Sequence, residues 1–106
     1  MDYVALTQQT VPVACRLFND AVQNGDMLYR PFTDEEFSRF FLTEEKGITK
    51  KAILLEDGTA FAAGCQVPES NKAYLTMLVV SREVRRFGVG TRLLAAMEQE
   101  LQKADD

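Results

Sequence analysis

The sequence predicts a single α+β domain, in which a mostly antiparallel sheet carries helices packed on it. Two observations lead to this prediction. The apolar patterns follow the order β-α-α-β-β-β-α along the chain, and a tight turn at Asp57-Gly58 joins two apolar runs as an antiparallel hairpin. The length of 106 residues, with 46% apolar residues, is enough for one core and too short for two domains.

The first half of the chain predicts one short strand and two helices. Asp2 to Leu6 can form the strand, and Thr10 is placed to cap a helix that Gly25 can end. The run Thr33-Asp34-Glu35-Glu36 is a capping-box pattern that opens a second, short helix. We expect the apolar side of that second helix to consist of Phe37, Phe40 and Phe41.

The second half predicts three strands and a final helix. The strands are expected over Ile48–Leu55, Thr59–Val67 and Ala73–Val80. The helix is expected over Thr91–Lys103, with its inward side made of Leu94, Met97 and Leu101.

Composition excludes several classes of function. The chain has no histidine, which removes Ser-His-Asp and Cys-His catalysis and most transition-metal sites, so we expect no metal. A net charge of −4 argues against a nucleic-acid partner. Cys15 and Cys65 are far apart and form no CxxC pair, so small buried side chains are expected rather than zinc ligands or reactive thiols. No apolar run approaches the roughly 20 residues that span a bilayer, and we expect a cytoplasmic protein without a membrane partner.

The segment SREVRRFGVGTRLL (Ser81–Leu94) follows an apolar run directly and leads into a helix. The first N–H groups of a helix have no partner within it and lie at the positive end of the helix dipole, which favours an anion. Gly88 and Gly90 have no Cβ atoms that would keep a phosphate from the backbone, and the long-range attraction comes from Arg85, Arg86 and Arg92. The segment therefore predicts a phosphate site. The alternative is a plain turn with solvated arginines.

The pattern of this segment distinguishes between known phosphate loops. The P-loop pattern GxxxxGK[ST] is absent, and Leu93 stands where the dinucleotide pattern GxGxxG would need a third glycine. The run RRFGVG, preceded by LVV and followed by TRLL, matches [Q/R]xxGxG before a leucine-rich helix. It resembles the acyl-CoA signature of the GNAT superfamily of N-acyltransferases. The order of elements resembles the N-terminal part of that three-layer fold.

The resemblance implies how a donor, acetyl-CoA, would bind. The pantetheine arm would pair like an added strand with the last strand before the signature, at Leu78, Val79 and Val80. An amide of that strand would polarise the thioester carbonyl. The amides expected to hold the pyrophosphate belong to Arg85, Arg86, Phe87, Gly88, Val89, Gly90 and Thr91.

The resemblance leaves the catalytic groups open. Members of the superfamily continue with a strand that splays from the signature strand and a helix that often supplies a tyrosine acid. No tyrosine follows Gly88 here. We therefore expect a truncated domain, completed by a further segment or by a second copy in a homodimer. Tyr74 is a candidate for a catalytic group, with simple packing as the alternative. Tyr29 and Phe32 are candidates for contacts to the acceptor, with ordinary anchoring of the loop as the alternative.

Three functions remain open at this point. The first is an N-acetyltransferase that moves an acetyl group from acetyl-CoA to the primary amine of a small molecule or peptide by direct attack. The second is a non-catalytic acyl-CoA-binding or regulatory half-domain. The third is a structural interaction domain with no affinity for coenzyme A.

Overall fold

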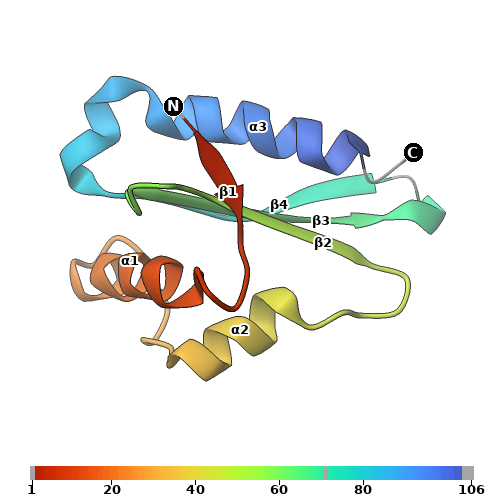
Figure 1. The fold of residues 1–106 in the computed structure, drawn as a ribbon, viewed down its shortest axis with the longest axis horizontal. Coiled ribbons are helices and arrows are strands. Elements are labelled where there is room, and N and C mark those ends of the chain that lie inside the picture. Colours follow the sequence, from red (N-terminus) through yellow and green to blue (C-terminus); the bar gives the residue numbers. More distant parts are fainter. Residues whose placement is uncertain (1, 71, 104–106) are drawn as a thin grey trace.

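The computed structural model describes residues 2–70 and 72–103. A four-stranded antiparallel sheet, in the order β1-β2-β3-β4, has two helices on one face and one on the other (Figure 1). The predicted order of elements and the layered α+β architecture are confirmed. The elements are β1 (Tyr3–Ala5), α1 (Val11–Gln23), α2 (Asp34–Leu42), β2 (Thr49–Leu55), β3 (Ala60–Val67), β4 (Lys72–Val80) and α3 (Val89–Lys103).

Both faces of the sheet are covered, and alternate residues of the strands face opposite layers. On β3, Phe61 and Ala63 pack against α1 and α2, whereas Ala60 and Ala62 pack against α3. Alanine at these positions lets the helix approach the sheet closely. The α3 layer is formed by Val89, Leu93, Met97 and Leu101, all of which are buried.

Local hydrogen bonds define the start of α2 and the end of α1. Thr33 and Glu36 form a reciprocal capping box at the start of α2, as predicted. At the end of α1, the N–H of Gly25 donates to Val22 O and the N–H of Asp26 donates to Ala21 O. This pair of bonds is a Schellman motif, and Gly25 adopts the left-handed conformation that the motif needs (φ 79°).

The start of α1 differs from the prediction in one respect. Thr10 occupies the N-cap position, but its side chain makes no capping hydrogen bond to the helix. Its Oγ1 instead accepts from the N–H of Thr7 at 2.7 Å. The hydroxyl is therefore used to close the preceding turn.

The last helix begins earlier than predicted. Residues Arg82–Phe87 form a 3-10 helix, Gly88 takes φ 71°, and α3 starts at Val89 rather than Thr91. The earlier start changes the inward face: Val89 and Leu93 are buried, and Leu94 is only half-buried. Since the side chains of one helix face recur every three or four residues, Val89, Leu93, Met97 and Leu101 make one continuous stripe.

Residues 2–70 and 72–103 contain neither a membrane-spanning helix nor a cluster of metal ligands. No helix in these ranges is long and apolar enough to cross a membrane. The same ranges contain no group of three or more acidic, cysteine or histidine side chains that could hold a metal ion.

Candidate functional site

An open groove lies where β4 ends and α3 begins. Its volume is about 410 Å³. The first turn of α3 points its N–H groups toward this end of the helix, because these amides have no partner one turn earlier. The groove is lined by six of the residues that the signature predicts for the coenzyme, namely Leu78, Val80, Arg85, Gly88, Gly90 and Thr91. The fold therefore brings the strand part and the loop part of the predicted site together.

Glycine occupies the two signature positions, Gly88 and Gly90, for different structural reasons. Gly88 has φ 71°, in the region that side chains disfavour, and a Cβ there would meet nothing within 4 Å. Gly88 is therefore required by the backbone turn. A Cβ on Gly90 would lie in ordinary contact with Val80, 3.5 Å from its Cγ2, so the fold tolerates a side chain there. What Gly90 preserves is open space in the groove.

The outer edge of β4 presents backbone groups beside this groove. The N–H of Ser81 donates to Thr59 O at 2.7 Å, so this pair is a hydrogen-bonded pair of the antiparallel ladder. Because such pairs alternate, the backbone groups of Val79 point toward β3 and those of Leu78 and Val80 toward the free edge. No strand in the described ranges covers that edge.

Two arginines of the segment Ser81–Leu94 are held by the end of α1. Arg82 makes two hydrogen bonds to the Asp26 carboxylate (3.2 and 2.9 Å) and a third to the carbonyl of Asn24. Arg85 donates to the same carboxylate at 2.8 Å and, through Nε, to the carbonyl of Val80 at 3.1 Å. The hydrogen bonds from Arg82, and then the one from Arg85, hold the pKa of Asp26 below its usual value. We call this arrangement the Asp26 clamp.

The remaining predicted residues of the coenzyme site fall into two groups. Val79 and Val89 are buried in the two cores, so only their backbone can meet a ligand. Phe87 is 67% exposed and does not line the groove. The backbone of Arg86 lies in the 3-10 helix, whereas its side chain is outside the described part of the structure.

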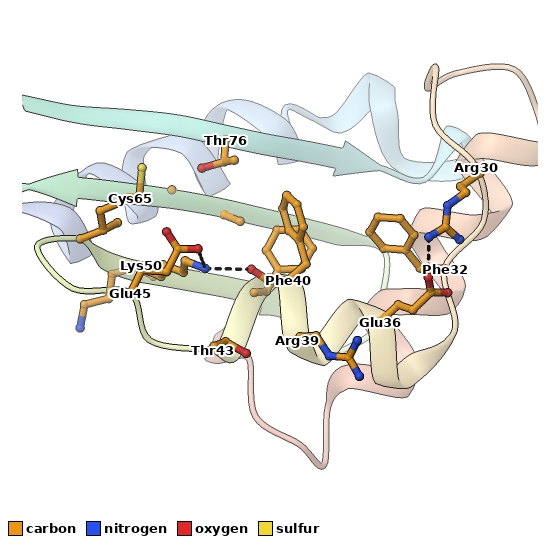
Figure 2. A pocket seen from close by; sticks show the side chains of 15 residues that line it. Arg30, Phe32, Glu36, Arg39, Phe40, Thr43, Glu45, Lys50, Cys65 and Thr76 are labelled. Carbon is orange, nitrogen blue, oxygen red and sulfur yellow. Dashed lines mark hydrogen bonds and ion pairs between the residues drawn. The ribbon is translucent and has the colours of Figure 1, made fainter.

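A second cavity, of about 560 Å³, lies between α2 and the sheet. We call it the aromatic pocket, because Phe32, Phe40 and Phe41 line it. Figure 2 shows the Arg30–Glu36 ion pair at one end and the Lys50–Glu45 pair at the other, with Phe32 and Phe40 between them. The further residues at its wall include Arg39, Thr43, Ile48, Ala63, Gly64, Cys65 and Thr76.

The aromatic pocket reaches β4 at an irregular point of the sheet. Ala63 pairs with Met77 but Gly64 pairs with Leu75, which leaves Thr76 as an extra residue in β4. Such a β-bulge bends the strand and often lies beside a functional site. Thr76 lines the aromatic pocket and Leu78, two residues later, lines the groove, so one strand joins the two cavities.

The predicted acceptor residues are only partly brought together. Phe32 lines the aromatic pocket, and Arg30 lies over its ring at 5.4 Å. Tyr29 is 53% exposed, packs on Phe18 with ring centroids 5.8 Å apart, and does not line the pocket. Tyr74 is 49% exposed and lies directly opposite Cys65 in the sheet, without lining the pocket itself.

The sequence reasoning missed most of the aromatic pocket. Phe40 was expected on the apolar side of its helix, yet Phe37 and Phe41 are buried and Phe40 is 49% exposed. The exposure of Phe40 could have been foreseen from the sequence. Phe40 lies about 100° from Phe41 around a helix, so it cannot share one narrow buried stripe with Phe37 and Phe41. Glu45, Lys50 and Thr76 gave no such signal, because only the tertiary fold places them together.

The two cysteines differ in environment. Cys15 is 2% exposed, and its Sγ donates to Phe32 O at 3.3 Å. Burial, together with the neighbouring Asp34 carboxylate, raises the pKa of Cys15 to about 11. Cys15 is thus an inert, buried thiol, as expected. Cys65 is half-buried at the wall of the aromatic pocket.

Comparisons with known proteins identify the fold and the family. No sequence among curated proteins matches the chain significantly. Among solved structures, an aminoglycoside acetyltransferase, meta-AAC0020, from an uncultured soil metagenomic sample and crystallised with trehalose, shares the fold with a TM-score of 0.66. The two are 22% identical, and the match covers 97% of this chain and 70% of that one. A sequence profile of the acetyltransferase (GNAT) family matches residues 15–105, and the chain belongs to that family.

Proposed function

We propose that this protein is an N-acetyltransferase that moves an acetyl group from acetyl-CoA to a primary amine. The observation that carries the proposal is the groove at the junction of β4 and α3. It combines the first-turn amides of a helix, a glycine that keeps the space open and a free strand edge, and the chain belongs to an acetyltransferase family.

The donor would use main-chain groups along its whole length. Its pyrophosphate would accept hydrogen bonds from the amides at Gly88, Val89, Gly90 and Thr91, where the helix dipole favours negative charge. Its pantetheine arm would pair with the free edge through Leu78 and the N–H of Val80. The carbonyl of Val80 already accepts one hydrogen bond from Arg85. The strand part of the proposed donor site therefore consists of Leu78 and Val80, because the backbone groups of Val79 point toward β3.

The reaction would be a direct transfer within a ternary complex. The neutral amine attacks the thioester carbonyl carbon, a C–N bond forms, and the C–S bond breaks. Coenzyme A leaves as a thiolate that takes up one proton, and the nitrogen loses one. A backbone amide of β4 can stabilise the negative oxygen of the intermediate. The bulge at Thr76 turns the backbone of β4 next to the point where the donor would end.

The free edge of β4 must be covered in the working protein. An edge strand with unpaired N–H and C=O groups readily pairs with another chain. We propose that the donor covers this edge at Leu78 and Val80, and that further protein residues or a second copy of this chain cover the rest of it. Amide hydrogen exchange tests this: the outward-facing N–H groups of β4 before Leu78 should exchange slowly without coenzyme A, whereas those of Leu78 and Val80 should slow only when it is bound. Fast exchange along the whole edge in a soluble monomer would remove the proposal.

Acetyl-CoA turnover tests the proposed function. Release of free thiol from acetyl-CoA is followed with a panel of primary amines, and calorimetry measures the binding of coenzyme A. We expect both binding and amine-dependent release. Binding without release for any amine would favour the non-catalytic acyl-CoA-binding domain. The absence of binding by a well-folded chain would favour a structural interaction domain and would end the proposal.

A further inference from the structure

We infer that the aromatic pocket binds the acceptor, and that the acceptor is a primary amine with an aromatic or branched apolar body and no more than one positive charge. This inference rests on the proposed function, since it names the substrate class of that reaction. It starts from the position of the pocket. Thr76 belongs to the pocket on the α2 side of the sheet and Leu78 to the donor groove on the α3 side, and these two residues lie roughly 7 Å apart along β4.

The first argument is the surface that the pocket offers to a ligand. Phe40 leaves 49% of its surface exposed although the same helix buries Phe37 and Phe41 completely or nearly so. Its ring lies 4.8 Å from that of Phe41 and 6.1 Å from that of Phe32, measured between centroids. The three rings form an apolar floor inside a concave surface, where an aromatic ligand would gain both burial and ring packing.

The second argument is the charge around that floor. Arg30 neutralises Glu36, and the contact, together with the N–H of Thr33, lowers the pKa of Glu36 to about 2. Lys50 neutralises Glu45 at 2.8 Å and also donates to the carbonyl of Phe40. Both carboxylates of the pocket are therefore already paired with cations at its wall.

Arg39 adds a third cation to the pocket. Its partner, Glu35, lies outside the lining, and both side chains of this pair are at least 70% exposed, so solvent screens the attraction. Lys51 also lines the pocket, which thus holds four cationic side chains against two paired carboxylates, in a protein of net charge −4. A ligand with several positive charges would lack a counter-charge here and would meet repulsion.

The expected acceptor therefore differs from that named for the fold neighbour. Aminoglycosides are polyhydroxylated and carry several ammonium groups. A polycation needs an acidic site, and a polyhydroxylated body needs many hydrogen-bonding groups in place of three phenylalanines. The aromatic pocket offers neither. An amine with a phenyl or branched alkyl group fits it, with the nitrogen toward Thr76 and Cys65 and the apolar body on Phe40.

A substrate panel tests the inference. The kcat/KM values for 2-phenylethylamine, isoamylamine, putrescine and kanamycin are compared at saturating acetyl-CoA. We expect the two apolar amines to exceed the polycations by about tenfold or more, since a buried apolar group is worth that factor in a pocket. Equal or higher kcat/KM values for kanamycin or putrescine would overturn the inference, while the proposed N-acetyltransferase function would still stand.

A truncation variant tests the floor of the pocket. Phe40→Ala is expected to lower kcat/KM for 2-phenylethylamine by about tenfold, through KM, because ring packing is lost. The KM for acetyl-CoA should not change. Val13→Ala is the matched control: Val13 is 45% exposed on α1 and lines neither cavity. Equal effects of the two variants would contradict the assignment.

A charge variant tests the selectivity. Arg39→Glu is expected to raise kcat/KM for putrescine relative to 2-phenylethylamine about threefold at low salt, and the gain should disappear at high salt. Arg16→Glu makes the same change of charge on an exposed residue of α1 that does not line the pocket. A preference that does not move with Arg39→Glu, or moves equally with both variants, would count against a role for the pocket's charge.

A binding measurement separates the inference from the proposed function. Calorimetry with N-acetyl-2-phenylethylamine, the product, requires no catalysis. We expect binding that is weakened about tenfold by Phe40→Ala and unchanged by Val13→Ala. If no amine were acetylated but this binding pattern were found, the proposed function would fail and the pocket assignment would stand. No binding at millimolar concentration would overturn the pocket assignment.

Discussion

The groove at the end of β4 and the aromatic pocket beside α2 would recognise ligands by different parts of the protein. The groove offers first-turn amides, a free strand edge and the space above Gly90. The aromatic pocket offers side chains, above all Phe40 with two ion pairs around it. Main-chain N–H and C=O groups hardly differ between residues, so many different sequences can build the same main-chain site. A site built from side chains is particular to one chain.

This difference explains why a donor, but not an acceptor, could be proposed from the sequence. A main-chain site constrains the backbone, and glycines at fixed spacing report that constraint directly. The side-chain site has no local pattern, because its residues come from α2, β2, β3, β4 and two loops. Four experiments can break or sharpen this comparison.

The largest effect is expected for Gly90→Val. Its side chain would fill the groove, and we expect the affinity for coenzyme A to fall by about tenfold or more while the fold persists, since a Cβ there makes only an ordinary contact. Calorimetry and circular dichroism measure the two quantities. Ala95→Val places the same β-branched residue at an exposed position of α3 and should bind normally. Unchanged affinity in Gly90→Val would show that the groove is not the donor site.

The next effect concerns the two thiols. At pH 8, a thiol reagent such as iodoacetamide should modify Cys65 and leave Cys15 intact, because Cys15 is buried and its pKa is raised to about 11. The label at Cys65 would occupy the aromatic pocket and should lower amine acetylation by about tenfold with little change in coenzyme A binding. Mass spectrometry locates the label. Faster labelling of Cys15, or equal loss of both activities, would contradict the separation of the two sites.

A smaller effect is expected for Asp26→Asn. The change releases Arg82 and Arg85 from their shared carboxylate, so the field at the groove becomes more positive. Coenzyme A binding should depend more steeply on salt, with a several-fold gain at low ionic strength that vanishes at high ionic strength. Asp20→Asn removes the same charge from an exposed residue of α1 and should change the slope less. Identical slopes in both variants would mean that the Asp26 clamp does not restrain the arginines.

The smallest effect concerns stability in acid. The pKa of Glu36 is lowered to about 2, first by Arg30 and then by the N–H of Thr33. A lowered carboxyl pKa stabilises the folded state above the unfolded value of 4.5, and this contribution disappears as pH falls toward 2. The melting temperature of Glu36→Gln should therefore be a few degrees lower than that of the unchanged protein at pH 6 and equal to it near pH 2. Glu44→Gln, an exposed residue outside the capping box, serves as the control. A gap that persisted at pH 2 would contradict the assigned pKa.

The sequence was most informative where local chemistry determines local structure. The capping box at Thr33 and Glu36 and the left-handed residue Gly25 were predicted because each depends on neighbours within a few positions. The start of α3 was misplaced by two residues, since Gly88 alone, rather than the whole glycine run, makes the turn. The bulge at Thr76 could not be predicted, because it depends on how β4 pairs with β3.

The construction of α2 has a consequence for how the acceptor preference of this protein could evolve. The helix is anchored in the core through Phe37 and Phe41, whereas Glu36, Arg39 and Phe40 face the pocket. Substitutions at Arg39 and Phe40 would alter what the pocket accepts and remove little that holds the domain together, whereas Glu36 also caps the helix. New acceptor preferences can thus arise by drift along one short helix, while the residues that would hold the donor stay untouched.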